Sequence, residues 1–253
     1  MYQKFRGLPD EDWLNKIAGT GGQPLFDLPE ESLQVSTVGK SGLSALRDAS
    51  MFYLFCRKML VEHGNGVSDG TAVMDFGCAW GRIIRFWMKD VPARNLLGVD
   101  VLEEYLNHAR KNVSGPTYMV IDNRPPLPHG AETFDLIYAF SVFSHLPEYL
   151  ANAWIEEFTK VLKPGGIICI TTRPRAHIEM AGTSSDTGAH SKMYADVLKR
   201  RDEALSEYDA GKFVFYGSGT KGKLGDDVYG EAIIPPAYIE AKWGGESRYD
   251  WIL

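Results

Sequence analysis

The sequence has few cysteines, no long apolar run and no excess of basic residues, and each absence excludes a class of protein. Its three cysteines, Cys56, Cys78 and Cys169, have the spacing of neither a zinc site nor a disulfide framework. No stretch approaches the roughly eighteen apolar residues of a membrane span, and the N-terminal segment lacks the apolar core of a signal peptide. The net charge of −6 disfavours the basic surface that binds nucleic acid. We therefore expect a cytoplasmic protein without a metal site that acts on a small molecule.

The composition allows a sizeable core, since 44% of the residues are hydrophobic and 12% are aromatic. No internal repeat or clean linker divides the chain. We expect a single domain, 1–253, in three parts: an N-terminal arm and helix at 1–63 that serves as a lid, a ligand-binding core at 71–172, and a substrate-side insertion with the completion of the sheet at 173–253.

Residues 72–88, AVMDFGCAWGRIIRFWM, have the pattern of a strand, a tight turn and a helix. The segment 73–76 suits a buried strand, and apolar residues four apart predict an amphipathic helix: Ile83 with Trp87 and Ile84 with Met88. Small residues at every second turn position, Gly77, Ala79 and Gly81, let the backbone approach a ligand closely. We expect the helix that starts near Gly81 to point unpaired N–H groups at that ligand. A nucleotide-like molecule suits such a turn.

Strands alternate with helical segments through the core, as the crossover connections of a parallel sheet require. The predicted fold is α/β, with a doubly wound, mostly parallel sheet, helices on both faces and an N-terminal helical addition. Ligands of such sheets bind beyond the carboxyl ends of the strands, where Asp75, Asp100, Asp122 and the residues after Phe140 would lie. The predicted helices are 10–17, 41–60, 102–109, 150–161, 193–208 and 235–243, and the predicted strands are 73–76, 95–101, 118–121, 134–140, 167–172 and 213–216.

Four signatures follow one another in this core. They are the loop Asp75-x-Gly77-x-Ala79-x-Gly81, Asp100 at the end of the second strand, FDLIYAFSVFSHL at 134–146 and LKPGG at 162–166. Together they resemble the class I S-adenosylmethionine-dependent methyltransferases. The resemblance implies a Rossmann-like fold, S-adenosyl-L-methionine as the cofactor and methyltransferase activity. The segments GCAWGR and SVFSHLP are similar in sequence to segments of bacterial methyltransferase domains that modify sugars, glycans and other small molecules. We therefore expect an acceptor of this kind, methylated at a hydroxyl.

The resemblance also assigns roles to single residues. Asp100 would accept hydrogen bonds from both ribose hydroxyls, because a carboxylate only accepts. The backbone of Gly77 and Gly81 would contact the methionine part of the cofactor, and Asp75 would fix the loop or meet the cofactor's amino group. Arg82 would pair with the cofactor's carboxylate. The other predicted cofactor residues are Cys78 and Ala79 beside the loop glycines, Val101 at the adenine, Asp122 or Asn123 at its exocyclic amine, and Phe140.

Two features depart from the family pattern. Ala79 stands where the family usually has glycine, and alanine would be costly if this position needed a positive φ. The family's sheet normally ends with two further strands, so either 213–216 and the terminal YDWIL fill those places or the chain ends short of them.

Two other functions remain as alternatives. An NAD-dependent oxidoreductase is the weaker one, because a dinucleotide-binding loop needs a small residue at the position of Arg82. The second is a cofactor-binding protein of the same fold that does not catalyse.

Methyl transfer depends mainly on alignment of the acceptor atom with the methyl group of the cofactor, and it needs a base only where the acceptor must lose a proton. His145 follows the fourth strand and its imidazole titrates in the useful range, so it is the predicted base, with a structural histidine as the equal alternative. Other residues could contact the acceptor or simply belong to the core and the solvated loops: Tyr138, Phe140, Phe143, Arg173, Arg175, His177 and His190. Trp13 and Phe26 could cover the cofactor or pack in the core.

Overall fold

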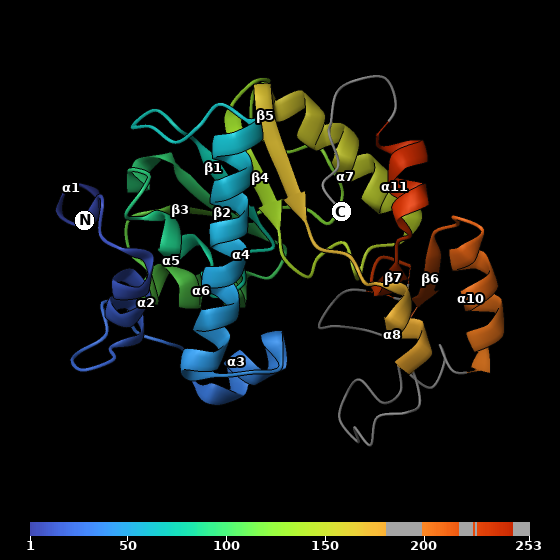
Figure 1. Cartoon of the computed structure of the whole chain (residues 1–253), viewed down its shortest axis with the longest axis horizontal. Helices are drawn as coiled ribbons and strands as arrows, with labels where there is room; N and C mark the ends of the chain where they lie inside the picture. The colour runs from blue at the N-terminus through green and yellow to red at the C-terminus, as the bar shows by residue number, and fades with distance from the viewer. Residues whose placement is uncertain (181–198, 218–224, 226, 245–253) are drawn as a thin grey trace. The chain divides into compact units, whose positions relative to one another are not determined.

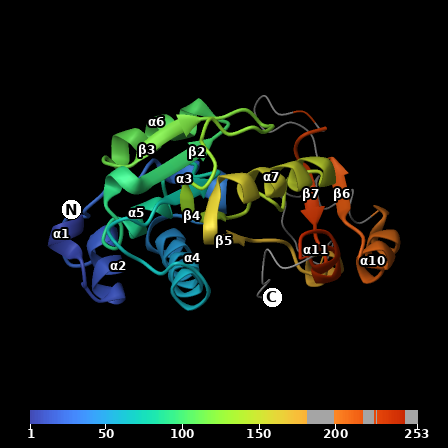
Figure 2. The same cartoon turned by 90° about the horizontal axis from the view of Figure 1, so that it is seen from above.

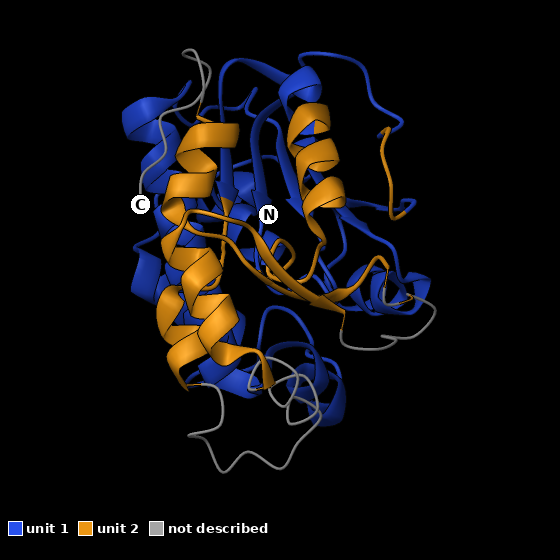
Figure 3. Ribbon diagram, turned by 90° about the vertical axis from the view of Figure 1, so that its right-hand side faces the viewer, with its two compact units in different colours: residues 1–122, 127–140, 158–169 blue, residues 123–126, 141–157, 170–253 orange. Residues whose placement is uncertain are grey.

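The computed structural model describes residues 1–180, 199–217, 225 and 227–244 (Figure 1 and, from above, Figure 2). Their Cα atoms group into two compact units, which Figure 3 distinguishes by colour. Unit 1 comprises residues 1–122, 127–140 and 158–169, and unit 2 comprises residues 123–126, 141–157 and 170–253. Most of the predicted cofactor residues therefore fall in unit 1, and the predicted base falls in unit 2.

Five strands form the sheet of unit 1: β1 (Val73–Phe76), β2 (Leu96–Asp100), β3 (Thr117–Val120), β4 (Phe134–Ala139) and β5 (Leu162–Ile170). Their order is β3-β2-β1-β4-β5. The ladders of β1 with β2 and β4, and of β2 with β3, are parallel, so Asp75 lies between Gly98 and Tyr138. All residues of β1, β2 and β4 are buried, as expected for strands covered on both faces.

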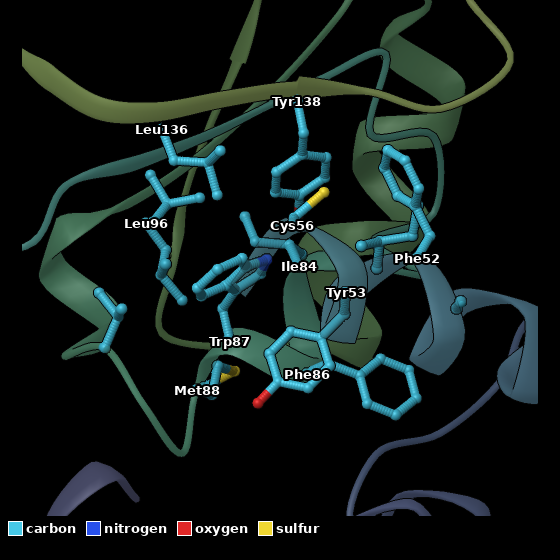
Figure 4. Close-up of a cluster of buried hydrophobic side chains, with 14 of the residues drawn as sticks. Phe52, Tyr53, Cys56, Ile84, Phe86, Trp87, Met88, Leu96, Leu136 and Tyr138 are labelled. Carbon is cyan, nitrogen blue, oxygen red and sulfur yellow. The ribbon is translucent and has the colours of Figure 1, made fainter. Parts of the chain in front are cut away.

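Helices cover both faces of this sheet. On one face α4 (Gly42–His63) and α5 (Ile84–Trp87) form an aromatic core, in which the ring centres of Tyr53 and Trp87 lie 5.2 Å apart (Figure 4). On the other face the ring of Phe158, from α7 (Glu148–Val161), lies 4.9 Å from that of Phe76. The doubly wound, mostly parallel sheet is thereby confirmed. The remaining helices of unit 1 are α1 (Tyr2–Phe5), α2 (Asp10–Ala18), α3 (Glu31–Val38), the 3-10 turn η1 (Ala93–Asn95) and α6 (Glu103–Asn112).

The helix after β1 is shorter than its sequence pattern predicts. α5 has only four residues and all of them are buried, so the prediction of an amphipathic helix is wrong. The apolar spacing reflects burial on every side, because this helix lies inside the core that α4 covers. β5 also begins at Leu162 rather than at Ile167, so the LKPGG signature belongs to the strand.

Unit 2 contains a second sheet of two strands. β6 (Val214–Gly217) and β7 (Gly230–Ile233) pair antiparallel. The predicted strand at 213–216 is confirmed in β6, but the alternative in which it joins the main sheet is wrong, because its partner is β7, which no sequence pattern predicted. The terminal YDWIL and residues 193–198 of a predicted helix lie outside the described residues. The helices of unit 2, besides α7, are α8 (Arg175–Met180), α10 (Arg201–Asp209) and α11 (Pro236–Lys242).

None of the helices in the described ranges is both long and apolar enough to cross a membrane.

A group of charged side chains fixes α2 to the rest of unit 1. Arg57 of α4 donates to both carboxylate oxygens of Asp10, at 2.8 and 2.6 Å, and Lys89 Nζ lies 2.6 Å from Asp10 Oδ1. Burial alone would raise the pKa of Asp10, but the hydrogen bonds from Arg57 and Lys89 lower it below its ordinary value. Asp10 therefore stabilises the fold at pH values above its ordinary pKa, and this contribution is lost as the pH falls through the lowered pKa.

We expect Asp10→Asn to reduce the free energy of unfolding by about 1–3 kcal/mol, because it removes the nearest counter-charge of Lys89. The Lys89 side chain is only 3% exposed. Urea denaturation at pH 7, followed by tryptophan fluorescence, measures the change. Asp12→Asn, at an exposed position of the same helix, is the matched control and should change stability by less than about 0.5 kcal/mol. Equal effects of the two substitutions would contradict the anchoring role of Asp10.

Candidate functional site

The loop after β1 has left-handed backbone at three alternate positions. The φ angle is 76° at Gly77, 44° at Ala79 and 75° at Gly81. Glycine adopts this region freely, whereas alanine there costs about 1–2 kcal/mol. Ala79, which stands where the resembled family usually has glycine, therefore has the positive φ that is costly for alanine. The loop adopts this backbone conformation despite the cost. Such strain persists only where surrounding contacts fix the backbone.

Asp100 supplies the contact that fixes the loop. Its Oδ2 accepts a hydrogen bond from the Ala79 N–H at 2.9 Å, and its Oδ1 accepts one from the Leu102 N–H at 3.0 Å. The N–H groups of Gly77 and Cys78 both donate to the carbonyl of Val99, at 2.8 and 3.0 Å. These two backbone hydrogen bonds orient the Asp100 carboxylate at the end of β2.

The prediction that a helix starts near Gly81 is wrong, because α5 begins at Ile84, whereas contact of the N–H groups at its start with a ligand stays a prediction. The N–H groups of Gly77, Cys78 and Ala79 have the acceptors just described, and that of Gly81 donates to the Cys78 carbonyl at 2.9 Å. α5 begins only at Ile84, and a four-residue helix aligns few peptide dipoles. The loop therefore offers a ligand close backbone approach and the Asp100 carboxylate.

Asp75 lies within β1 and is buried. Burial raises the pKa of its carboxyl to about 7, although the nearby Tyr138 hydroxyl and the Arg82 guanidinium act to lower it. Its Oδ2 is shielded from solvent and finds no hydrogen-bond partner within the described part of the chain. These surroundings suit a group that fixes the loop from inside the sheet, and contact with a cofactor amino group stays a prediction.

Arg82 and Cys78 are buried as well. Arg82 Nη1 donates to the carbonyl of Ala45 at 2.9 Å, and its guanidinium lies 4.8 Å from the ring centre of Phe140. Arg82 thus joins the loop to α4, and its pairing with a cofactor carboxylate stays a prediction. Burial raises the pKa of the Cys78 thiol, so the thiol remains protonated and is a poor nucleophile.

The ends of β2 and β3 lie side by side. Val120 pairs with Asp100, and the Ile121 N–H donates to the Asp100 carbonyl at 3.0 Å. Val101 and Asp122 follow these two strands, the first half-buried and the second exposed. Asn123 belongs to unit 2, where its carbonyl accepts a hydrogen bond from Trp154 Nε1 at 3.3 Å. In unit 1 the loop, Asp100, Val101 and Asp122 therefore lie at the carboxyl ends of β1, β2 and β3. Their roles in binding stay predictions.

In unit 2 three of the predicted acceptor-site residues surround a carboxylate that no motif marks. Glu231 of β7 is 1% exposed. His145 Nδ1 lies 3.4 Å from its Oε1 and His177 Nε2 lies 3.4 Å from its Oε2, while Arg173 forms an ion pair with the same carboxylate. No sequence signal points to Glu231, because β7 is short and distant in sequence from His145.

The remaining candidates do not gather at either place. Trp13 and Phe26 are buried in the core of unit 1, and Phe143 is buried in unit 2. Arg175 forms exposed ion pairs on α8, and His190 lies outside the described residues. A lid function for 1–63 stays a prediction.

Comparison with known proteins finds similarity to methyltransferases over part of the chain. Residues 73–166 match the family described as a methyltransferase domain. The erythromycin 3''-O-methyltransferase of Saccharopolyspora erythraea is 29% identical over 113 residues, which are 42% of this chain and 35% of that protein. The trans-aconitate 2-methyltransferase of Azoarcus is 31% identical over 104 residues, which are 41% of this chain and 40% of that protein.

Among solved structures, an S-adenosylmethionine-dependent methyltransferase from Mesorhizobium loti is 27% identical. The match covers 48% of this chain and 53% of that one, with a TM-score of 0.39. The match covers less than half the length of each of the two curated relatives named above.

The raised pKa of Asp75 predicts a pH dependence of stability. Between its ordinary pKa of 3.8 and its folded value of about 7, the folded state binds a proton that the unfolded state has lost. Raising the pH through this window therefore lowers the free energy of unfolding, by at most about 1.4 kcal/mol per pH unit. Asp75→Asn removes this term.

Urea denaturation of the two proteins from pH 4 to pH 8 measures it. The stability of Asp75→Asn relative to the unsubstituted protein should rise with pH across the window and level off above it. Asp12→Asn, at an exposed position, should show no such trend. Parallel stability profiles for the unsubstituted protein and Asp75→Asn would contradict the buried, raised-pKa carboxyl.

Proposed function

The chain has a class I S-adenosylmethionine-dependent methyltransferase domain, and we propose that the protein uses it to methylate a hydroxyl group of a small molecule or glycan. The observation that carries the cofactor part is the Asp100 carboxylate, held at the end of β2 by two backbone N–H groups beside the left-handed loop. In this proposal His145 acts at the acceptor.

The residues of unit 1 fit S-adenosylmethionine. An oriented, acceptor-only carboxylate suits the two hydroxyl donors of a ribose. Gly98 keeps the loop close to β2, because a Cβ there would lie 2.8 Å from Cys78 Sγ. Gly77 and Gly81 have no side chains, which suits close contact of the backbone with an extended ligand at these two positions.

When bound, the cofactor supplies a methyl group on an activated sulfonium, so the chain mainly has to align the acceptor and exclude water. Asp100 would hold the ribose, and the loop would hold the methionine part. Asp75 supports the loop from within β1. His145 would take up the proton that an acceptor hydroxyl loses.

The choice of a small molecule as the acceptor is supported by two observations. The net charge of −6 disfavours nucleic acid as a partner. Two relatives of the domain are named for the small molecules erythromycin and trans-aconitate. The proposal includes a single functional domain in which residues 173–253 contribute to acceptor choice, and a cytoplasmic location.

Asp100→Asn should weaken binding of S-adenosylhomocysteine about 10- to 100-fold, because hydrogen bonds to a charged group contribute about 1.5–3 kcal/mol. Isothermal titration calorimetry measures this. Glu104→Gln, which removes an exposed negative charge from the following helix, should leave the affinity within about twofold. No binding by the unsubstituted protein would contradict the proposed function, whereas equal binding by Asp100→Asn would contradict only the ribose contact.

His145→Ala should lower turnover about tenfold or more, the low end of a general-base contribution, while leaving S-adenosylhomocysteine affinity nearly unchanged. Turnover is measured as transfer of labelled methyl from S-adenosylmethionine to a panel of small-molecule alcohols and saccharides. His63→Ala, on the half-exposed end of α4, is the control. Equal losses of turnover and binding would mean that His145 is structural, and binding without transfer by the unsubstituted protein would favour a non-catalytic protein.

A further inference from the structure

The outer side of α4 in unit 1 is exposed and largely apolar. α4 lies in front of the sheet of unit 1 in Figure 1, and its inner side is buried in the core. On the outer side Met51 is 70% exposed, Phe55 41% and Val61 58%, and Leu54 is half-buried. One exposed apolar side chain is ordinary, but several on one side of a helix indicate a surface that contacts another molecule.

These side chains lie along one line on the helix. Met51 is three positions from Leu54 and four from Phe55, and Val61 is seven positions from Leu54, so neighbours on this line are one helical turn apart. Spacings of three and four residues are typical of a helix that packs against another helix. We call the line the α4 stripe; it comprises Arg47, Met51, Leu54, Phe55, Lys58, Val61 and Glu62.

The two ends of the α4 stripe carry charges of opposite sign. Arg47, at the N-terminal end, is exposed and forms no ion pair within the part of the chain that the structure describes. Its neighbour Asp48 is already paired with Lys40, at 2.6 Å. Glu62, at the C-terminal end, has an exposed and long contact with Lys58 Nζ, at 3.8 Å, which leaves its carboxylate accessible to a further cation.

Two copies of α4 that pack antiparallel would bring these ends together. With a two-fold axis between Leu54 and Phe55, Arg47 lies opposite the partner's Glu62, and Leu54 lies opposite the partner's Phe55. Met51 then lies opposite the partner's Lys58, whose aliphatic stem can cover it. Parallel packing would instead place Arg47 against the partner's Arg47, and like charges at such a contact repel each other.

We propose that the α4 stripe is the interface of a homodimer with two-fold symmetry, in which the two α4 helices pack antiparallel. A two-fold interface uses the same surface of both subunits, so the contact between Arg47 and Glu62 forms twice. Burial of the apolar side chains drives the association, and the charges at the ends set its direction. The order of these charges matches a second copy of the chain, which favours self-association over an unrelated partner.

The dimer goes beyond the proposed methyltransferase function and does not depend on it. None of the residues of the α4 stripe is a predicted cofactor or acceptor residue. A failure of this inference therefore leaves the proposed function untouched, and the reverse also holds.

Analytical ultracentrifugation of the full chain at a series of micromolar concentrations tests the dimer. We expect a reversible equilibrium between monomer and dimer. Met51→Lys should raise the dimer dissociation constant at least about tenfold, because it removes an apolar side chain and places a cation opposite the partner's Lys58. Glu104→Gln, at an exposed position of α6, makes the same change in net charge and should leave the dissociation constant within about twofold.

Exchange of the end charges tests the antiparallel register. Arg47→Glu and Glu62→Arg should each raise the dissociation constant at least about tenfold, because each places like charges opposite one another twice in the dimer. The double variant Arg47→Glu, Glu62→Arg restores opposite charges and should return the constant to within about threefold of the original. Circular dichroism establishes that each variant is folded.

Three results would overturn the proposal. A monomeric unsubstituted protein would mean that another part of the chain, a different protein or only solvent covers the α4 stripe. A dimer that Met51→Lys leaves intact would place the interface elsewhere. Single variants that dissociate without rescue by the folded double variant would contradict the antiparallel register.

Discussion

The hydrogen bond from the Ala79 N–H to Asp100 Oδ2 joins the loop after β1 to the end of β2, and the shape of that loop depends on it. Ala79 has a positive φ that costs alanine about 1–2 kcal/mol. A hydrogen bond to a charged acceptor is strong enough to offset this cost. The parallel register of β1 and β2 places the two residues side by side, because Phe76 lies opposite Val99. The Asp100 carboxylate thus stabilises the loop, and in the proposed function it also accepts hydrogen bonds from the ribose.

Each unit has a buried carboxylate beside groups that the backbone holds in place. In unit 1 the backbone N–H groups of Ala79 and Leu102 orient Asp100 at the end of a strand. In unit 2 the strand that carries Glu231 also supplies the Gly230 carbonyl that fixes the His145 ring. The chemistry of a methyltransferase, in which alignment matters more than acid–base catalysis, suits groups that the backbone holds in place.

Much of the main sheet could be predicted from the sequence, because buried strands and long helices leave strong local patterns. The runs at Val73–Phe76, Leu96–Asp100 and Phe134–Ala139 are short and mainly apolar, and α4 has the helical period. The sequence predicts an amphipathic helix at α5, because apolar residues four positions apart do not show whether the opposite side of the helix is also buried. β7 and Glu231 have no such signal: a four-residue strand carries little periodicity, and its contacts with His145 and Arg173 connect segments far apart in sequence.

The position of the cofactor relative to Asp100 is the central claim of this account, and a crystal structure with S-adenosylhomocysteine tests it most directly. The account predicts ligand density along Gly77–Gly81, with both ribose hydroxyls within hydrogen-bond distance of the Asp100 carboxylate and the Ala79 N–H bond retained. Density elsewhere, or a ribose that does not contact Asp100, would contradict it.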